Sequence, residues 1–188
     1  MNIPASSIQR NNFSINCNGR LVDLNTPKIM GILNLTPDSF SDGGKFNNEK
    51  SALLHAEKLL KDGADFIDIG AQSTRPNAEY LSAEEEIRRI GNVISLIKKE
   101  FPEALISIDT FYADVVKFGY NEGMDVVNDI SGGYFDENLL PTVAETRLPY
   151  ILMHSNTSYA TMHEKIHYED ITMSVNYYFS EKINQLQK

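Results

Sequence analysis

The sequence predicts an α/β protein with a parallel sheet, built as a single domain over residues 1–188. From Lys28 onward, short and nearly continuous apolar runs alternate with longer segments of helical period. This alternation is typical of parallel strands joined by right-handed helical crossovers. Two architectures satisfy it, a doubly wound open sheet and a (β/α)8 barrel, and both place their chemistry at the carboxyl ends of the strands.

The first predicted element is a β-hairpin over residues 13–24. Two alternating segments, Phe13–Cys17 and Arg20–Leu24, flank the dipeptide Asn18-Gly19. That dipeptide suits a type I′ turn, whose two central residues both need a positive φ.

Five strands are predicted by runs rich in β-branched and apolar residues, at residues 29–35, 64–70, 105–110, 125–130 and 150–154. Polar residues collect at their carboxyl ends, namely Asn34, Ser73–Arg75, Asp109, Asn128-Asp129 and His154. The amino-terminal ends of the strands show no comparable group of polar residues. Because the carboxyl ends of parallel strands meet at one edge of a sheet, these side chains predict a functional site there.

Helices are predicted between the strands. The apolar pattern of residues 52–60 stops at Asp62-Gly63, where Gly63 suits a left-handed cap. Ser82 with Glu85 has the spacing of a capping box, and it opens a helix that continues to the residue before Pro102. Further helices are expected over residues 112–122, 137–146 and 171–187.

Composition excludes several classes of function. The chain has 17 Lys and Arg against 26 Asp and Glu, a net charge of −9, which argues against general affinity for nucleic acid or an anionic membrane. The sequence has no apolar stretch long enough for a membrane span and no signal sequence in residues 1–12, so we expect a cytoplasmic protein. Its single cysteine, Cys17, excludes an internal disulfide and is expected to be a buried or half-buried thiol.

One motif points to other chemistry, and a second segment has to be weighed as a phosphate-binding loop. The run His163–His167 matches the H-E-x-x-H pattern of zinc proteases, in which two histidines one helical turn apart bind the metal. The polar stretch before it and the scarcity of downstream ligands favour a chance match. The segment Asp42–Lys45 lacks the spacing and the hydroxyl of a phosphate-binding P-loop.

The strand-end residues support more specific hypotheses. Asn34 and Asp38 offer oxygen ligands of the kind that Mg²⁺ prefers, although the loop from Asn34 to Gly44 also reads as an ordinary connection. Residues 73–76 place two hydroxyls and the Arg75 guanidinium where a diphosphate or carboxylate would bind. Asp109 either caps the following helix or, with Asn128, binds an amino-pyrimidinone ring.

Together these segments resemble one family, dihydropteroate synthase. Residues 30–44 resemble its first signature and residues 63–76 its second, and residues 106–110, 127–130 and 152–154 follow in the family's order. The resemblance extends from the hairpin to the last helix. It also implies that residues 161–171 are an ordinary segment of the family and form no zinc site.

The resemblance implies a TIM barrel, with the hairpin covering its base. It implies condensation of 6-hydroxymethyl-7,8-dihydropterin diphosphate with p-aminobenzoate, assisted by Mg²⁺, to give 7,8-dihydropteroate and diphosphate. It also implies a role for each matched position. Asn34 would lie at the diphosphate and Mg²⁺ end, Asp38 and Arg75 would act in catalysis, Thr74 and Arg75 would contact substrate oxygens, Phe40 and Pro76 would enclose p-aminobenzoate, and Asp109 and Asn128 would hold the pterin ring.

Three departures from the family are visible. Asn77 and Ser155 stand where the family usually has Gly and Met. The chain also ends after the fifth βα unit, without the family's later Lys and Arg-x-His segments, whereas a (β/α)8 barrel typically has about 250 residues. We therefore expect a fragment that is inactive alone, from a full-length protein that is a homodimer. The alternative is a pterin-binding module, related to methyltransferase domains, that holds the ring without this chemistry.

Overall fold

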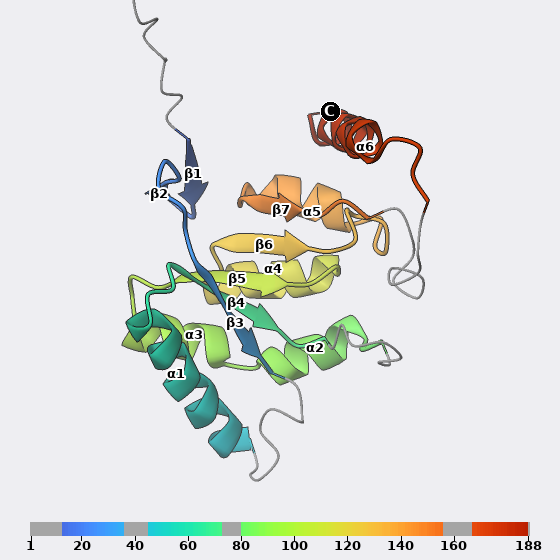
Figure 1. Ribbon diagram of the computed structural model, residues 1–188. Helices are drawn as coiled ribbons and strands as arrows, with labels where there is room; N and C mark the ends of the chain where they lie inside the picture. Colours follow the sequence, from blue (N-terminus) through green and yellow to red (C-terminus); the bar gives the residue numbers. More distant parts are fainter. Residues whose placement is uncertain (1–12, 36–44, 73–79, 156–166, 188) are drawn as a thin grey trace, which may run out of the picture.

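The computed structural model describes residues 13–35, 45–72, 80–155 and 167–187. Its centre is a parallel five-stranded sheet, in which the strands lie side by side in chain order (Figure 1). The strands are β3 (Met30–Asn34), β4 (Phe66–Gly70), β5 (Leu105–Asp109), β6 (Val126–Asp129) and β7 (Tyr150–Leu152). All five predicted strands are confirmed.

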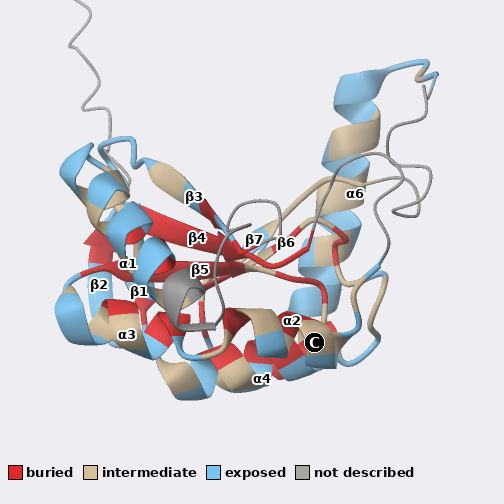
Figure 2. Ribbon diagram, turned by 90° about the horizontal axis from the view of Figure 1, so that it is seen from below, coloured by how far each residue is buried: buried red, intermediate tan, exposed pale blue. Residues whose placement is uncertain are grey.

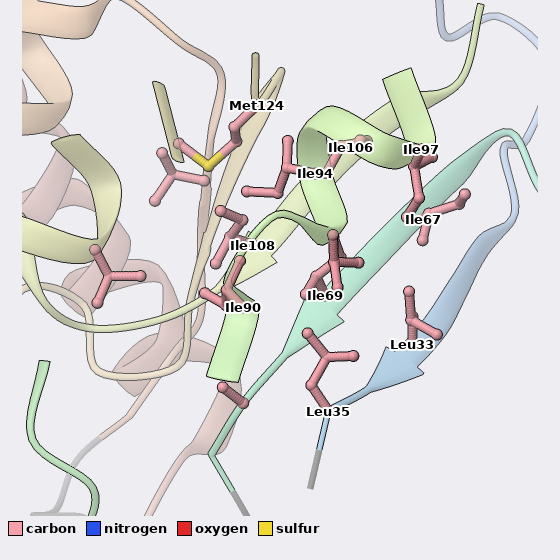
Figure 3. Close-up of a cluster of buried hydrophobic side chains, with 14 of the residues drawn as sticks. Leu33, Leu35, Ile67, Ile69, Ile90, Ile94, Ile97, Ile106, Ile108 and Met124 are labelled. Carbon is pink, nitrogen blue, oxygen red and sulfur yellow. The ribbon is translucent and has the colours of Figure 1, made fainter. Parts of the chain in front are cut away.

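Helices cover the sheet on one face. They are α1 (Lys45–Lys61), α2 (Ala83–Ile90), α3 (Val93–Glu100), α4 (Ala113–Glu122) and α5 (Leu139–Thr146), and a further helix, α6 (Ile171–Leu186), follows β7. Apolar residues of the strands and of these first five helices form one buried cluster, part of which is drawn in Figure 3. Strands in chain order with helices on one face are the arrangement of consecutive units of a (β/α)8 barrel, and they decide against the doubly wound sheet.

The period of two along each strand divides its side chains between two faces. The residues that face the helices are apolar and buried: Leu33, Ile67, Ile69, Ile106, Ile108 and Val127. The alternate positions, which face the inside of the curved sheet, are polar or small near the carboxyl ends: Asn34, Asp68, Gly70, Ser107, Asp109 and Asn128. The inner face is therefore the one that carries chemistry.

The predicted hairpin is present as β1 (Ser14–Cys17) and β2 (Arg20–Asp23). Asn18 and Gly19 have φ of 50° and 90°, as a type I′ turn requires. Cys17 is 1% exposed and packs with the first residues of the strands, among them Phe66 and Leu105. The hairpin thus covers the amino-terminal ends of the strands and leaves the carboxyl ends accessible.

One helix predicted between Ser82 and Pro102 is in fact two. Gly91 adopts a φ of +50°, which ends α2 before Asn92 opens α3. Ser82 caps α2 by accepting a hydrogen bond from the Glu85 amide at 3.3 Å, as its spacing predicts. The reciprocal half of the capping box is absent, because the Glu85 carboxylate pairs instead with Arg88 and Arg89.

Helix α6 contacts the rest of the chain least. It begins at Asp170, whose side chain accepts a hydrogen bond from the Met173 amide, and none of its residues is buried. Figure 2 shows it projecting from the sheet with exposed and half-exposed residues along its length. Within the described ranges, no helix has both the length and the apolar character needed to cross a membrane.

Candidate active site

Three strand ends bring the predicted residues together. Asn34 ends β3, Asp109 ends β5 and Asn128 is the inward residue near the end of β6, in register with Asp109. Between Asn34 and Asp109 lies Gly70, where a β-carbon would be 3.4 Å from Asn34 Oδ1 and 4.0 Å from Asp109 Oδ2. The missing side chain leaves a space that both oxygens border.

Asp68 joins this cluster from one layer deeper. It is 7% exposed, and its Oδ2 accepts a hydrogen bond from Asn128 Nδ2 at 3.0 Å. The second oxygen, Oδ1, and the Oγ of its buried register neighbour Ser107 have no hydrogen-bond partner among the described residues. Buried polar atoms almost always have a partner, so these two indicate a place for water or for a polar ligand group.

The carboxyl of Asp109 is surrounded by other carboxylates. Burial, together with the negative charges of Asp68, Glu86 and Asp129, raises the pKa of Asp109 to about 7. Burial also raises the pKa of Glu86 to about 7. Groups that add hydrogen-bond donors or positive charge to Asp109 therefore stabilise its anion, and a donor-rich ring is a suitable ligand.

Two other strand-end residues have different roles. Asp129 faces the helices instead of the inner face, is fully buried, and accepts hydrogen bonds from the Ser131 and Gly133 amides and the Tyr150 hydroxyl. It holds the loop after β6 in place. His154 packs against the rings of Tyr178 and Phe179, and its buried Nε2 has no hydrogen-bond partner within the described ranges.

Sequence reasoning missed Asp68, Ser107, Gly70 and Glu86. For the first two a signal exists, because each is a polar residue two positions before a strand end and therefore on the same face as the terminal residue. Glu86 has a different signal, because it stands four positions before the buried Ile90 and therefore on the same face of α2. Its burial depends on the tertiary contact with Thr110.

The remaining predicted residues lie outside the described ranges. These are Asp38, Phe40, Thr74, Arg75 and Pro76, and their predicted roles stay predictions. The same holds for His163 of the H-E-x-x-H run, while its second histidine, His167, is described and exposed. Within the described ranges, no three His, Cys, Asp or Glu side chains are grouped as a metal site would need.

The chain was compared with known proteins. Residues 30–188 match the family of pterin binding enzymes. The chain belongs to this family. The dihydropteroate synthase of Escherichia coli is 41% identical over 170 residues, and the mitochondrial folate synthesis bifunctional protein of Arabidopsis thaliana is 44% identical over 155. These alignments cover 90% and 80% of this chain.

Solved structures of dihydropteroate synthases superpose on this chain. A Yersinia pestis dihydropteroate synthase bound to a sulfonamide drug superposes with a TM-score of 0.83 at 37% identity, over 93% of this chain. A Xanthomonas albilineans dihydropteroate synthase in complex with 7,8-dihydropteroate superposes with a TM-score of 0.77 at 32% identity, also over 93% of this chain. The predicted TIM-barrel fold is confirmed, with five of its strands described here.

The chain covers only part of the length of its relatives. It spans 60% of the Escherichia coli enzyme, 28% of the Arabidopsis protein and 62% of the Yersinia structure. Consistent with a partial barrel, Ile32 on the inner face is 61% exposed, and β3 and β7 each pair on one side only within the described ranges. An inner face this open is unlike the packed interior of a closed barrel.

Proposed function

We propose that this chain forms the pterin-binding part of a dihydropteroate synthase of folate biosynthesis, a transferase. The reaction joins 6-hydroxymethyl-7,8-dihydropterin diphosphate to p-aminobenzoate and releases diphosphate. The observation that carries the proposal is the inward group of Asp109, Asn128 and Asp68 in a chain 41% identical to the Escherichia coli enzyme. A structure of a relative with 4-aminobenzoic acid supports the second substrate.

The chemistry of the ring fits the site. An amino-pyrimidinone presents adjacent N–H donors, which a carboxylate accepts as a pair, and Asp109 supplies that carboxylate at the mouth of the sheet. Asn128 is already oriented by its hydrogen bond to Asp68, so it meets the ring without losing further side-chain freedom. Those donors stabilise the carboxylate anion of Asp109, so the deprotonated fraction of Asp109 increases when the ring binds.

Magnesium is part of the proposal. Asn34 offers an amide oxygen that borders the space over Gly70, and it is a hard donor of the kind that Mg²⁺ prefers. Asn34 would hold the ion together with diphosphate oxygens. When bound, the ion would stabilise the negative charge that develops on the departing diphosphate.

The remaining groups in the proposal are Asp38 and Arg75 as catalytic residues, Thr74 and Arg75 as contacts for substrate oxygens, and Phe40 and Pro76 around p-aminobenzoate. Departure of diphosphate leaves a cation at the pterin methylene carbon, and the arylamine nitrogen attacks it and loses a proton. Exclusion of water protects that cation. We place the reaction in the cytoplasm, in a full-length protein that is a homodimer.

The test separates binding from turnover. The purified 188-residue chain is expected to bind 6-hydroxymethylpterin in a calorimetric titration and to lose that binding at least tenfold in Asp109→Asn. The exposed Asp114→Asn is the matched control. Incubated with both substrates and Mg²⁺, the chain alone is expected to form no 7,8-dihydropteroate. A chimera that adds the remaining 40% of the Escherichia coli enzyme is expected to form it.

The outcomes also distinguish the synthase from the second candidate, a pterin-binding module without transfer chemistry. Its support is that Asp68, Asp109 and Asn128, which suit a ring, are grouped in the structure, whereas Thr74 and Arg75 lie outside the described ranges. Ring binding with no Mg²⁺-dependent gain for the diphosphate form, and an inactive chimera, would favour this module. Failure to bind either pterin, with the fold intact by circular dichroism, would contradict both candidates.

A further inference from the structure

Glu86 is a carboxylate on the core-facing side of α2, and none of its surface is exposed. Its Oε2 accepts a hydrogen bond from the Thr110 hydroxyl at 2.8 Å, while its buried Oε1 has no hydrogen-bond partner among the described residues. Ordinary surface charge does not explain a fully buried Glu, because burying a carboxylate costs several kcal/mol. Glu86 therefore has a role other than keeping the outer surface of α2 polar.

Thr110 links Glu86 to the candidate site. It directly follows Asp109, and its amide donates to the Asn128 carbonyl at 3.0 Å. Its hydroxyl oxygen also accepts from the Tyr112 amide at 3.2 Å, as the chain enters α4. One buried residue thus joins α2, the end of β5, the end of β6 and the start of α4, and the two ring-facing residues lie directly on either side of it.

The electrostatic environment connects the same groups. The negative charges of Asp68 on β4, Glu86 on α2 and Asp129 on β6 each raise the pKa of Asp109. Glu86 is faced by Arg89 on its own helix and by the side chains of Gln72 and Thr110, which oppose the effect of burial on its pKa. The Glu86 charge also contributes to the raised pKa of Tyr112, at the start of α4.

We propose that Glu86 is a positioning residue of the ring site, which acts through the Thr110 hydroxyl to fix the end of β5 and whose charge is coupled to that of Asp109. The coupling means that Glu86 and Asp109 do not titrate independently. When ligand donors stabilise the Asp109 anion, the negative charge of Asp109 favours the protonated form of Glu86. The buried Glu86 carboxyl then holds the proton that the two groups share. The catalytic meaning of this role rests on the proposed function, in which Asp109 binds the ring.

The test is a ¹³C NMR titration of the Asp and Glu carboxyl groups in the 188-residue chain without ligand, with Asp109→Asn and Glu86→Gln used for assignment. In the unmodified chain, both signals are expected to titrate near neutral pH in overlapping steps. Glu86→Gln removes the charge and keeps the shape, and it is expected to lower the Asp109 midpoint by about 1 pH unit. By reciprocity, Asp109→Asn lowers the Glu86 midpoint by the same amount.

The matched control is Glu85→Gln, one position earlier on the same helix. Glu85 pairs with Arg88 and Arg89 on the outer side, so its loss is expected to leave the Asp109 midpoint unchanged within about 0.2 units. The hydroxyl link is tested separately. Thr110→Val removes a hydrogen bond to the charged carboxyl and is expected to raise the Glu86 midpoint, whereas Thr110→Ser restores it.

A purely structural role for Glu86 would lower thermal stability without moving the Asp109 midpoint. The proposal is overturned if Glu86→Gln leaves that midpoint in place, or if Thr110→Val and Thr110→Ser give the same Glu86 midpoint. If Glu86→Gln does not fold, the comparison of the unmodified chain with Asp109→Asn decides alone, because a Glu86 midpoint unmoved by that change contradicts coupling. No ligand is present, so a failed ring-binding experiment leaves this result unaffected.

Discussion

Asn128 and Asp68, on strands separated by β5, are joined by a hydrogen bond of 3.0 Å from Nδ2 to Oδ2 across the inner face of the sheet. The bond holds the Asn128 amide in one orientation beside Asp109. It also gives a donor to the buried Asp68 carboxylate, whose other oxygen has no hydrogen-bond partner within the described ranges.

Asn128→Ala is expected to weaken pterin binding at least tenfold and to lower the free energy of unfolding by about 1–3 kcal/mol, because Asp68 then lacks its donor. Calorimetric titration and urea unfolding measure the two effects. The control is Asn92→Ala, since the exposed Asn92 side chain makes no capping hydrogen bond at the start of α3. Equal effects from the two variants would show that the Asn128–Asp68 bond has no special role.

Gly70→Ala is expected to leave the fold intact and to reduce ring binding. The added β-carbon meets its nearest neighbour, Asn34 Oδ1, at an ordinary contact distance of 3.4 Å, and it fills the space that Asn34 and Asp109 border. The comparison variant is Gly119→Ala, where the new carbon would lie 2.4 Å from Ile108 Cδ1 in the core. We expect Gly119→Ala to lower the melting temperature and Gly70→Ala to change it by no more than a few degrees. Undiminished ring binding by Gly70→Ala would place the ligand elsewhere.

Stability is expected to fall as the pH rises from about 4 to 7. The pKa of Asp109 is raised from 3.8 to about 7 in the folded chain, so within this window the folded state binds more protons than the unfolded state. Glu86, raised to about 7, acts in the same direction. Asp109→Asn removes the penalty, and it is expected to stabilise the chain at pH 8 by roughly 2–4 kcal/mol and to be neutral near pH 3.5.

Urea unfolding of Asp109→Asn and the unmodified chain, from pH 3.5 to 8, measures this difference. The control is Asp114→Asn, an exposed carboxylate at the start of α4. A difference between Asp109→Asn and the unmodified chain that is constant with pH would contradict the raised pKa.

Lys98→Met is expected to destabilise the chain by about 3 kcal/mol without altering the ring site. Lys98 Nζ binds Asp125 Oδ2 at 2.5 Å and the Ala104 carbonyl at 2.9 Å, at the amino-terminal ends of β5 and β6. Its removal leaves Asp125, which is 4% exposed, as an unpaired buried charge. The surface pair of Lys117 and Asp114 gives the control: Lys117→Met should change the unfolding free energy by less than about 0.5 kcal/mol.

The sequence by itself determined the order and type of the elements. Apolar runs, the Asn18-Gly19 turn and the Ser82 cap are local signals, and each depends on neighbours within a few residues. Asn34, Asp109 and Asn128 could be assigned to one edge of the sheet from the sequence, because each lies at or near the carboxyl end of a predicted parallel strand. The split at Gly91 was missed because helical period continues on both sides of it, and only its backbone φ reveals the break.

Tertiary structure decided between the two architectures that the alternation of strands and helices allows, and it decided which side chains meet. Helices on one face of a sheet in chain order, and the burial of Glu86 against Thr110, are relations between residues far apart in the chain. The same holds for Asp129, which adjoins Asn128 in sequence yet faces the helices and supports a loop. A local sequence pattern does not specify which distant residues will pack against it. The difference between a ligand-binding carboxylate and a structural one is therefore set only by tertiary packing.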